Sequence, residues 1–311
     1  MERHWSHYMH LGFVHFMLFP EVMGGDGPIL ESLRHLTADD FFQVAEITHI
    51  ADPAVAKQAK ALSESTKLNL GYGVQPILLR NQLNLASIDE SHRQAVVVRV
   101  KQAVDEAYAM GTRVLGLFDG PSSFPGEEYK DQALKAFAES LKEICAYAEQ
   151  QRTDYTLWVS LEQFDRDVDK KSLVGPIEDT LPLCQAVRAQ CGNFGLLVDQ
   201  GHLPLLGETP LATLSAAREY LGHIHLGSCI KQPGHALYGD QHPRFGHEDG
   251  ENDTAELTEF LRILFEIGYF DSDVPTDKPL CTFELKPAPG EDSLSLMANA
   301  KRTFQAAWAQ L

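Results

Sequence analysis

The sequence contains few cysteines and no C-x-x-C pair. An odd number of cysteines without paired spacing fits neither a disulfide framework nor a zinc ribbon. We therefore expect reduced thiols that serve mostly as small core residues in a cytoplasmic protein. The five cysteines are Cys145, Cys184, Cys191, Cys229 and Cys281.

Positive charge is also scarce. The chain has 26 Lys and Arg residues and 44 Asp and Glu residues, which give a formal net charge of -18. So acidic a chain repels phosphate backbones and anionic lipids, and we expect neither nucleic acid nor a membrane as its partner. No apolar run approaches the length of a membrane span. We do not expect the run at 11–19 to be a signal peptide, because three histidines precede it, His15 interrupts it and no small-residue cleavage site follows.

Short apolar segments alternate with helix-like segments along the 311 residues. Eight strands are expected at 10–17, 42–48, 68–76, 113–118, 155–161, 195–198, 222–226 and 280–283. Helices are expected at 54–63, 89–110, 128–150, 177–190, 211–220, 254–267 and 293–307. Strands that alternate with helices predict a single α/β domain, a (β/α)8 TIM barrel over 1–311.

Four consecutive predicted strands, the fifth to the eighth, end in or carry residues that can bind metals. Because the carboxyl ends of barrel strands meet at one rim, with neighbours about 4.8 Å apart, these side chains can converge. Three carboxylates and one imidazole suit one divalent ion such as Mn²⁺ or Mg²⁺, and Co²⁺ and Zn²⁺ are also compatible. The predicted metal ligands are Glu162, Asp199, His225 and Glu284.

Each of these residues also has a structural interpretation. The two glutamates could form ion pairs with Arg166 or Lys286, and the aspartate could cap a helix. The histidine could be a hydrogen-bonded core residue, and strand alternation leaves open whether His223 lies beside His225. Four ligand-type residues on four neighbouring strands nevertheless favour a metal site.

The segment 227–253 lacks helical periodicity, and loops of this length are often functional. Its His242 and Arg244 could bind a substrate oxygen or phosphate, because arginine makes bidentate contacts with anions. A rigid surface turn explains them equally well. His15, predicted at the end of the first strand, and Glu46, on the second, are candidate pocket residues.

Several motifs resemble the xylose isomerase-like TIM-barrel superfamily of sugar isomerases and epimerases. The ketose 3-epimerase branch of this superfamily binds one divalent ion through residues that correspond to the four strand-end ligands. Its D-x-x-H histidine, which contacts a substrate oxygen, corresponds to His202. The motifs are LEQFDRD at 161–167, LLVDQGH at 196–202, HIHLG at 223–227 and FELKP at 283–287.

The chain departs from the epimerase pattern at two substrate-binding positions. Lys231 stands near the position of an epimerase arginine, and Val168 occupies the position of a second glutamate. The segment YGDQHPRFG at 238–246 is similar to a subgroup known only as sugar isomerases or epimerases. The resemblance therefore implies Lys231 as a substrate contact.

The resemblance implies a metal-dependent isomerase or epimerase that acts on a small carbohydrate, with Mn²⁺ as the expected cofactor. The ion would hold a carbonyl and an adjacent hydroxyl of a keto sugar and stabilise an enediolate. Glu162 and Glu284 would lie on opposite faces of the substrate and exchange protons with it as catalytic base and acid. His202 would polarise or orient a substrate oxygen.

Three other functions compete with this interpretation. A dehydratase of keto-inositols, or a lyase of 3-keto-glycosides that include C-glycosides, would use the same enediolate. An apurinic-site endonuclease shares the barrel but needs a trinuclear zinc site with more histidines and a basic face, which the net charge opposes. The last is a sugar-binding barrel without catalysis. A homo-oligomer is compatible with each of them.

Overall fold

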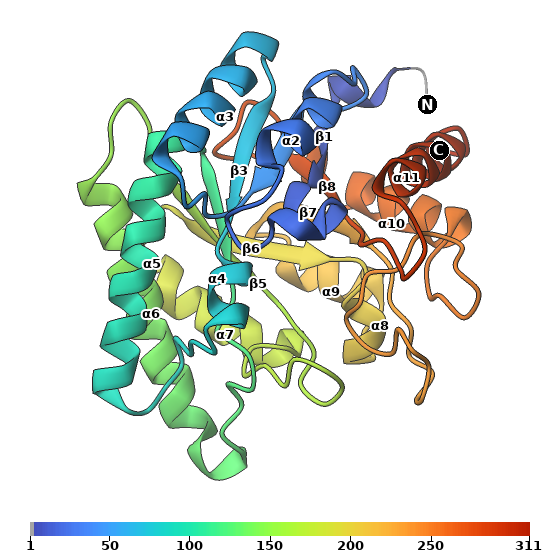
Figure 1. The fold of residues 1–311 in the computed structure, drawn as a ribbon. Coiled ribbons are helices and arrows are strands. Elements are labelled where there is room, and N and C mark those ends of the chain that lie inside the picture. The colour runs from blue at the N-terminus through green and yellow to red at the C-terminus, as the bar shows by residue number, and fades with distance from the viewer. Residues whose placement is uncertain (1–2) are drawn as a thin grey trace.

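Eight parallel strands close into a barrel in which β1 to β8 follow one another in chain order (Figure 1). The computed structural model describes residues 3–311. The closed barrel with helices between its strands confirms the predicted (β/α)8 architecture. The strands are β1 (His10–Val14), β2 (Val44–Ile47), β3 (Asn69–Gly73), β4 (Val114–Leu117), β5 (Trp158–Glu162), β6 (Phe194–Asp199), β7 (Leu221–Gly227) and β8 (Leu280–Glu284).

Helices surround the barrel, and the two longest of them, α5 and α6, lie side by side on its outer face (Figure 1). The helices are α1 (His15–Leu18), α2 (Ile29–Thr37), α3 (Pro53–Thr66), α4 (Gln75–Arg80), α5 (Glu90–Met110), α6 (Lys130–Gln150), α7 (Ile177–Arg188), α8 (Leu203–Leu206), α9 (Pro210–Ala217), α10 (Thr254–Glu266) and α11 (Ser293–Trp308). Within residues 3–311, no helix is long and apolar enough to cross a membrane.

Helix α5 shows how local sequence sets these elements. The Asp89 carboxylate accepts hydrogen bonds from the backbone N–H groups of Ser91 at 2.9 Å and His92 at 3.3 Å. These bonds satisfy donors that the first helical turn leaves free. Val97 and Val104 are fully buried on its inner face. Gly111, with φ 79°, ends the helix in a left-handed conformation that suits glycine.

Two predicted strands extend too far. The first strand ends at Val14, and His15 begins helix α1; the third ends at Gly73, and Gln75 begins helix α4. Val14 and Gly73 are the last residues of these two strands that pair with a neighbouring strand. An apolar run alone does not distinguish a strand from the buried helical turn that follows it, which explains both errors.

All five cysteines are buried and form no disulfide. Their burial agrees with the expectation that they pack as small core residues. The two ends of the described chain lie close together (Figure 1), where the Trp308 indole N–H donates to the backbone carbonyl of Arg3 at 3.3 Å.

Candidate metal centre

The structure brings the four predicted ligands together at the carboxyl end of the barrel. Each offers one ligand atom, and these atoms all lie within 4.8 Å of one another. All four side chains are buried. The residues are Glu162 at the end of β5, Asp199 at the end of β6, His225 on β7 and Glu284 at the end of β8.

The Nδ1 atom of His225 lies at the centre of this cluster. It is 2.6 Å from Glu284 Oε2, 3.4 Å from Glu162 Oε1 and 3.8 Å from Asp199 Oδ2. Glu162 Oε1 and Asp199 Oδ2 are buried and have no hydrogen-bond partner among residues 3–311. A buried carboxylate oxygen without a donor is costly, and a divalent cation satisfies several such oxygens at once. The donor set therefore fits a divalent ion.

The remaining oxygens of two of these carboxylates are held in place. Glu162 Oε2 accepts a hydrogen bond from Gln75 Nε2 at 2.7 Å, and Asp199 Oδ1 accepts one from the backbone N–H of Gly201. Gly116 makes room for this glutamine, because a Cβ atom there would lie 3.0 Å from Gln75 Nε2. Each carboxylate thus has one fixed oxygen and one oxygen free for a ligand.

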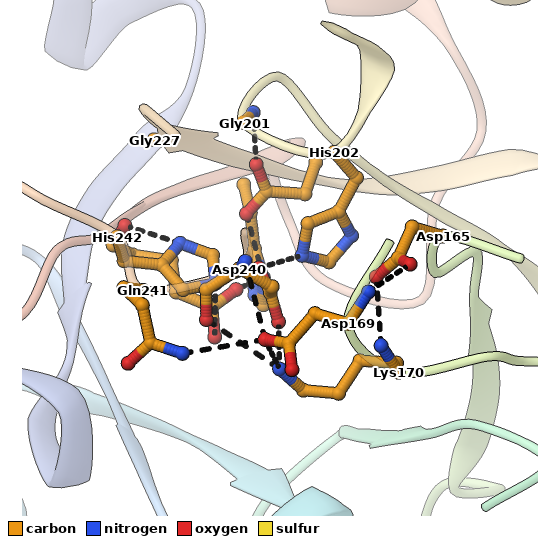
Figure 2. A network of polar contacts seen from close by, with 12 residues as sticks. Asp165, Asp169, Lys170, Gly201, His202, Gly227, Asp240, Gln241 and His242 are labelled. Atoms are coloured by element: carbon orange, nitrogen blue, oxygen red, sulfur yellow. Dashed lines mark hydrogen bonds and ion pairs between the residues drawn. The ribbon is translucent and has the colours of Figure 1, made fainter. Parts of the chain in front are cut away.

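A fourth buried carboxylate, Asp240, links three loops over the mouth of the barrel. Its Oδ1 lies 3.0 Å from His202 Nε2 and 2.7 Å from His242 Nε2, and its Oδ2 lies 2.8 Å from Lys170 Nζ. Figure 2 shows Asp240 between the two imidazoles and the lysine. The β5–α7, β6–α8 and β7–α10 loops therefore meet at one buried acid.

Both histidines are oriented by the backbone. His202 Nδ1 lies 2.6 Å from the carbonyl oxygen of Gln163, and His242 Nδ1 lies 3.0 Å from the carbonyl oxygen of Glu284. Each Nδ1 therefore carries the proton and donates, and each Nε2 faces the mouth. His242 adopts φ 50°, a left-handed conformation that is uncommon outside glycine. Its loop holds this imidazole in place at a conformational cost.

Burial and charge act against each other at the mouth. Burial raises the pKa of Asp199 to about 6. Burial alone would lower the pKa of His242, but the carboxylates of Asp240 and Glu284 raise it to about 9. Burial would likewise raise the pKa of Asp240, yet His242, Lys170 and His202 hold it well below its usual range. The mouth thus contains buried acids and bases in direct contact, as sites of proton transfer do.

A fifth buried carboxylate, Glu46, lies below the ligands. Glu46 Oε1 accepts hydrogen bonds from His223 Nε2 at 2.9 Å, from His225 Nε2 at 3.1 Å and from the Thr282 hydroxyl. Burial would raise the pKa of Glu46, but the two imidazoles hold it well below its usual range. His223 therefore lies on the same inward face as His225. Glu46, a predicted pocket residue, lies inside the barrel below the ligands and not at its mouth.

Three predicted substrate residues lie away from the four ligands. His15 is buried with its Nε2 2.8 Å from the Ser32 hydroxyl. Lys231 is half-exposed, lies 3.2 Å from a carboxylate oxygen of Glu251, and lines a cavity of about 550 Å³ beside Gln200. Arg244 Nε lies 3.0 Å from Glu291 Oε1, in the loop between β8 and α11.

The structure offers no support for the ion-pair interpretation of the two glutamate ligands. Arg166 instead pairs with Asp179 at 2.7 Å, and Lys286 donates to Gln241 at 3.1 Å. Among residues 3–311, the ion-pair contacts of Glu162 and Glu284 are to histidines only.

The sequence analysis did not identify three polar residues of this site. Gln75 was assigned to the end of a strand, whereas it begins helix α4 and holds Glu162. Lys170 lies outside every predicted strand and helix, yet its side chain is only 14% exposed and pairs with Asp240. The third residue is Asp240. Its only signal in the sequence is that it lies two residues before His242 in the segment 238–246.

Comparison with known proteins places this geometry in context. A family model described as a xylose isomerase-like TIM barrel matches residues 38–299. A D-tagatose 3-epimerase-like protein has a similar structure, with 18% identity, a TM-score of 0.71, and coverage of 97% of this chain and 99% of its own. No curated protein sequence matches the chain.

Two further solved structures share the fold. One is 3-keto-D-glucoside 4-epimerase from E. coli in its apo form, with 15% identity, a TM-score of 0.66, and coverage of 96% of this chain and 99% of its own. The other is the IOLI protein with a bound zinc atom, with 16% identity, a TM-score of 0.69, and coverage of 97% of this chain and 99% of its own. At these identities the likenesses establish the fold.

Proposed function

The chain belongs to the xylose isomerase-like TIM-barrel family, and we propose that it is a metal-dependent isomerase or epimerase of a sugar or sugar derivative. The observation that carries this proposal is the convergence of three buried carboxylates and one imidazole at the carboxyl end of the barrel. Two of the carboxylate oxygens are unpartnered among residues 3–311. Active sites of TIM-barrel enzymes lie at this end.

One divalent ion would be held by the four predicted ligands, with Mn²⁺ as the expected metal and Mg²⁺, Co²⁺ and Zn²⁺ as alternatives. The zinc atom in the IOLI structure shows that a protein of this fold can hold a transition metal. When bound, the ion would supply the positive charge that favours enediolate formation from a keto sugar.

Glu162 and Glu284 would move the protons. They end strands β5 and β8, so they approach the centre of the mouth from different sides of the barrel. One carboxylate would remove the proton next to the carbonyl, and the other would return a proton from the opposite face, which inverts that carbon. Return to the neighbouring carbon would instead interconvert an aldose and a ketose.

His202 and His242 would bind substrate oxygens. Both present Nε2 toward the mouth because a backbone carbonyl holds the opposite ring nitrogen. Burial alone would lower the pKa of both imidazoles, but Asp240 raises them, that of His242 to about 9, so Nε2 carries a proton as well as Nδ1 at neutral pH. Such an N–H donor stabilises a developing oxyanion more strongly in a dry site than in water. Contacts of the substrate with Lys231, Arg244 and His15 stay predictions, since in this structure each of these residues is paired elsewhere.

A second candidate is a dehydratase or lyase that acts on keto-inositols or 3-keto-glycosides, including C-glycosides. The observation that favours it is the Asp240–His242 pair at 2.7 Å, which adds an acid to the two glutamates. An imidazolium there could protonate a leaving oxygen after the enediolate forms. Release of water or of an aglycone distinguishes this reaction from epimerisation.

We further propose that residues 1–311 form one domain and that the protein works in the cytoplasm on small carbohydrates, without nucleic acid or membrane partners. Five buried free thiols and the net charge of -18 support this setting.

The test combines metal analysis with a substrate screen. Protein loaded separately with Mn²⁺, Mg²⁺, Co²⁺ or Zn²⁺ is incubated with ketoses, keto-inositols and 3-keto-glycosides, and products are identified by NMR. We expect about one ion per chain and a metal-dependent epimer or isomer, with turnover lost in Glu162→Gln and Glu284→Gln. The exposed Glu259→Gln is the matched control and should retain turnover. Failure to bind any of these ions would overturn the proposal.

A further inference from the structure

Glu46 is a buried carboxylate that the proposed reaction does not use. It lies on β2, is 1% exposed, and faces the barrel interior. Gly71 on the adjacent strand makes room for it, because a Cβ atom there would lie 2.9 Å from Glu46 Cγ. A charged side chain inside a barrel is costly unless it is paired, so its partners indicate what it does.

Three polar groups converge on one oxygen of this carboxylate. His223 Nε2 lies 2.9 Å and His225 Nε2 lies 3.1 Å from Glu46 Oε1, and the Thr282 hydroxyl donates to the same atom. The two histidines come from β7 and the threonine from β8. One oxygen from β2 therefore cross-links two other strands directly below the metal ligands.

This contact determines which nitrogen of His225 can bind a metal. A neutral imidazole has one N–H donor and one lone pair. Both ring nitrogens of His225 lie within hydrogen-bond distance of a carboxylate, Nε2 of Glu46 and Nδ1 of Glu284 at 2.6 Å. A metal ion displaces the proton from only one of them, and Nδ1 is the nitrogen that faces the ligand carboxylates. Because Nε2–H stays with Glu46, the proton that leaves is the one on Nδ1. His223 and Thr282 hold the same oxygen, so it does not reach the ion site itself.

We propose that Glu46 is a positioning residue for the metal centre, which holds His225 as its Nε2–H tautomer and so makes Nδ1 the ligand. The inference rests on the proposed ligand set. In metal sites a carboxylate behind a ligating histidine fixes the ring and raises its basicity, and its loss weakens metal affinity by about 10–100-fold.

The first test measures metal affinity in the apo protein by titration calorimetry with Mn²⁺ and Zn²⁺. We expect Glu46→Ala to weaken binding by about 10–100-fold. Glu46→Gln keeps an acceptor oxygen of the same shape and should recover most of the affinity. Asp277→Asn is the matched control, because it removes the carboxylate partner of His10 at the opposite end of the barrel and should leave metal affinity unchanged.

The second test identifies the ligating nitrogen in zinc-loaded protein with ¹⁵N-labelled histidine, with His225→Asn used to assign the signals. We expect His225 to carry a proton on Nε2 that exchanges slowly in the wild type and quickly in Glu46→Ala. A wild-type His225 protonated at Nδ1 would overturn the inference, as would a folded Glu46→Ala that binds metal as tightly as the wild type. If the wild type binds no ion, the proposed function fails first, and this result is distinct from the other two.

Discussion

At the scale of the residue, the mouth of this barrel is defined by buried charge in direct contact. Asp240 and Lys170 come from loops about seventy residues apart, yet their side chains are only 4% and 14% exposed. Each charge also has a second partner on its own segment, since Asp169 lies 3.0 Å from Lys170 Nζ and His242 lies 2.7 Å from Asp240. Such a pair is expensive to break, because the remaining charge stays buried.

The pair gives a direct stability prediction. Asp240→Asn should destabilise the protein by about 3 kcal/mol, since it removes the buried carboxylate that Lys170 and two imidazoles share and leaves the lysine only Asp169, which is 33% exposed. Adding Lys170→Met should recover part of that loss. Urea unfolding of the two single variants and the double variant measures the coupling, and purely additive losses would contradict a direct interaction.

His15 gives the clearest pH prediction. Burial lowers its pKa to about 4, so the folded state binds its proton less readily than the unfolded chain does. Between the unfolded pKa, about 6.5, and the folded pKa the unfolded state holds more protons, and stability falls as the pH falls through this window. From about pH 7.5 to pH 5 this residue should cost about 2 kcal/mol.

Unfolding free energies of the wild type and His15→Asn, measured across that pH range, isolate this contribution. The variant should lose less stability on acidification than the wild type. Equal slopes for the two proteins would show that His15 is accessible to protons in the folded state.

Sequence alone identified some residues of this site and not others, for a physical reason. Glu162, Asp199 and Glu284 each interrupt a short apolar run at the end of a strand, a pattern that is visible along the chain. Lys170 and Asp240 lie on irregular loops, and only the folded structure brings them together. Periodicity carries no information about such contacts.

At the scale of the element, long helices were predictable because capping residues and periodicity agree. Helix α5 begins after the Asp89 cap and ends at Gly111, within one residue of its predicted bounds. Helices α1 and α4 were joined to strands because their four and six residues make too few turns to show a period. Helix α2 was missed although Ile29, Leu33 and Leu36 recur at helical spacing and are buried.

The cap of α5 can be tested by itself. Asp89→Ala removes the acceptor of two backbone N–H groups and should cost about 1 kcal/mol. Asp89→Asn caps nearly as well and should cost little. Chemical denaturation of both variants measures the difference, and an equal loss in the two would indicate that the charge, rather than the cap, matters at this position.

At the scale of the whole molecule, three of the 44 acidic residues meet at one end of the barrel. Glu162, Asp199 and Glu284 crowd one end of an acidic barrel, and their mutual repulsion opposes folding unless a cation is present. The global stability of the protein should therefore depend on divalent metal.

Metal removal should lower the thermal midpoint, and re-addition should restore it. At an ion concentration about 100 times the dissociation constant, binding to the folded state adds about 2.7 kcal/mol. Asp199→Asn should abolish the shift and Glu259→Gln should preserve it. Thermal unfolding after chelation, and again after Mn²⁺ is returned, measures the shift in the midpoint. A midpoint that changes in neither step would contradict a resident ion.

Proton transfer at the carbon next to a carbonyl is the central claim, and solvent deuterium tests it most directly. Metal-loaded protein is incubated in D₂O with each keto sugar, keto-inositol and 3-keto-glycoside, and the α-carbon is followed by NMR. The account predicts deuterium at that carbon in substrate or product, with uptake lost in Glu162→Gln and Glu284→Gln. Product that retains its original hydrogen, or no uptake with any of these compounds, would contradict it.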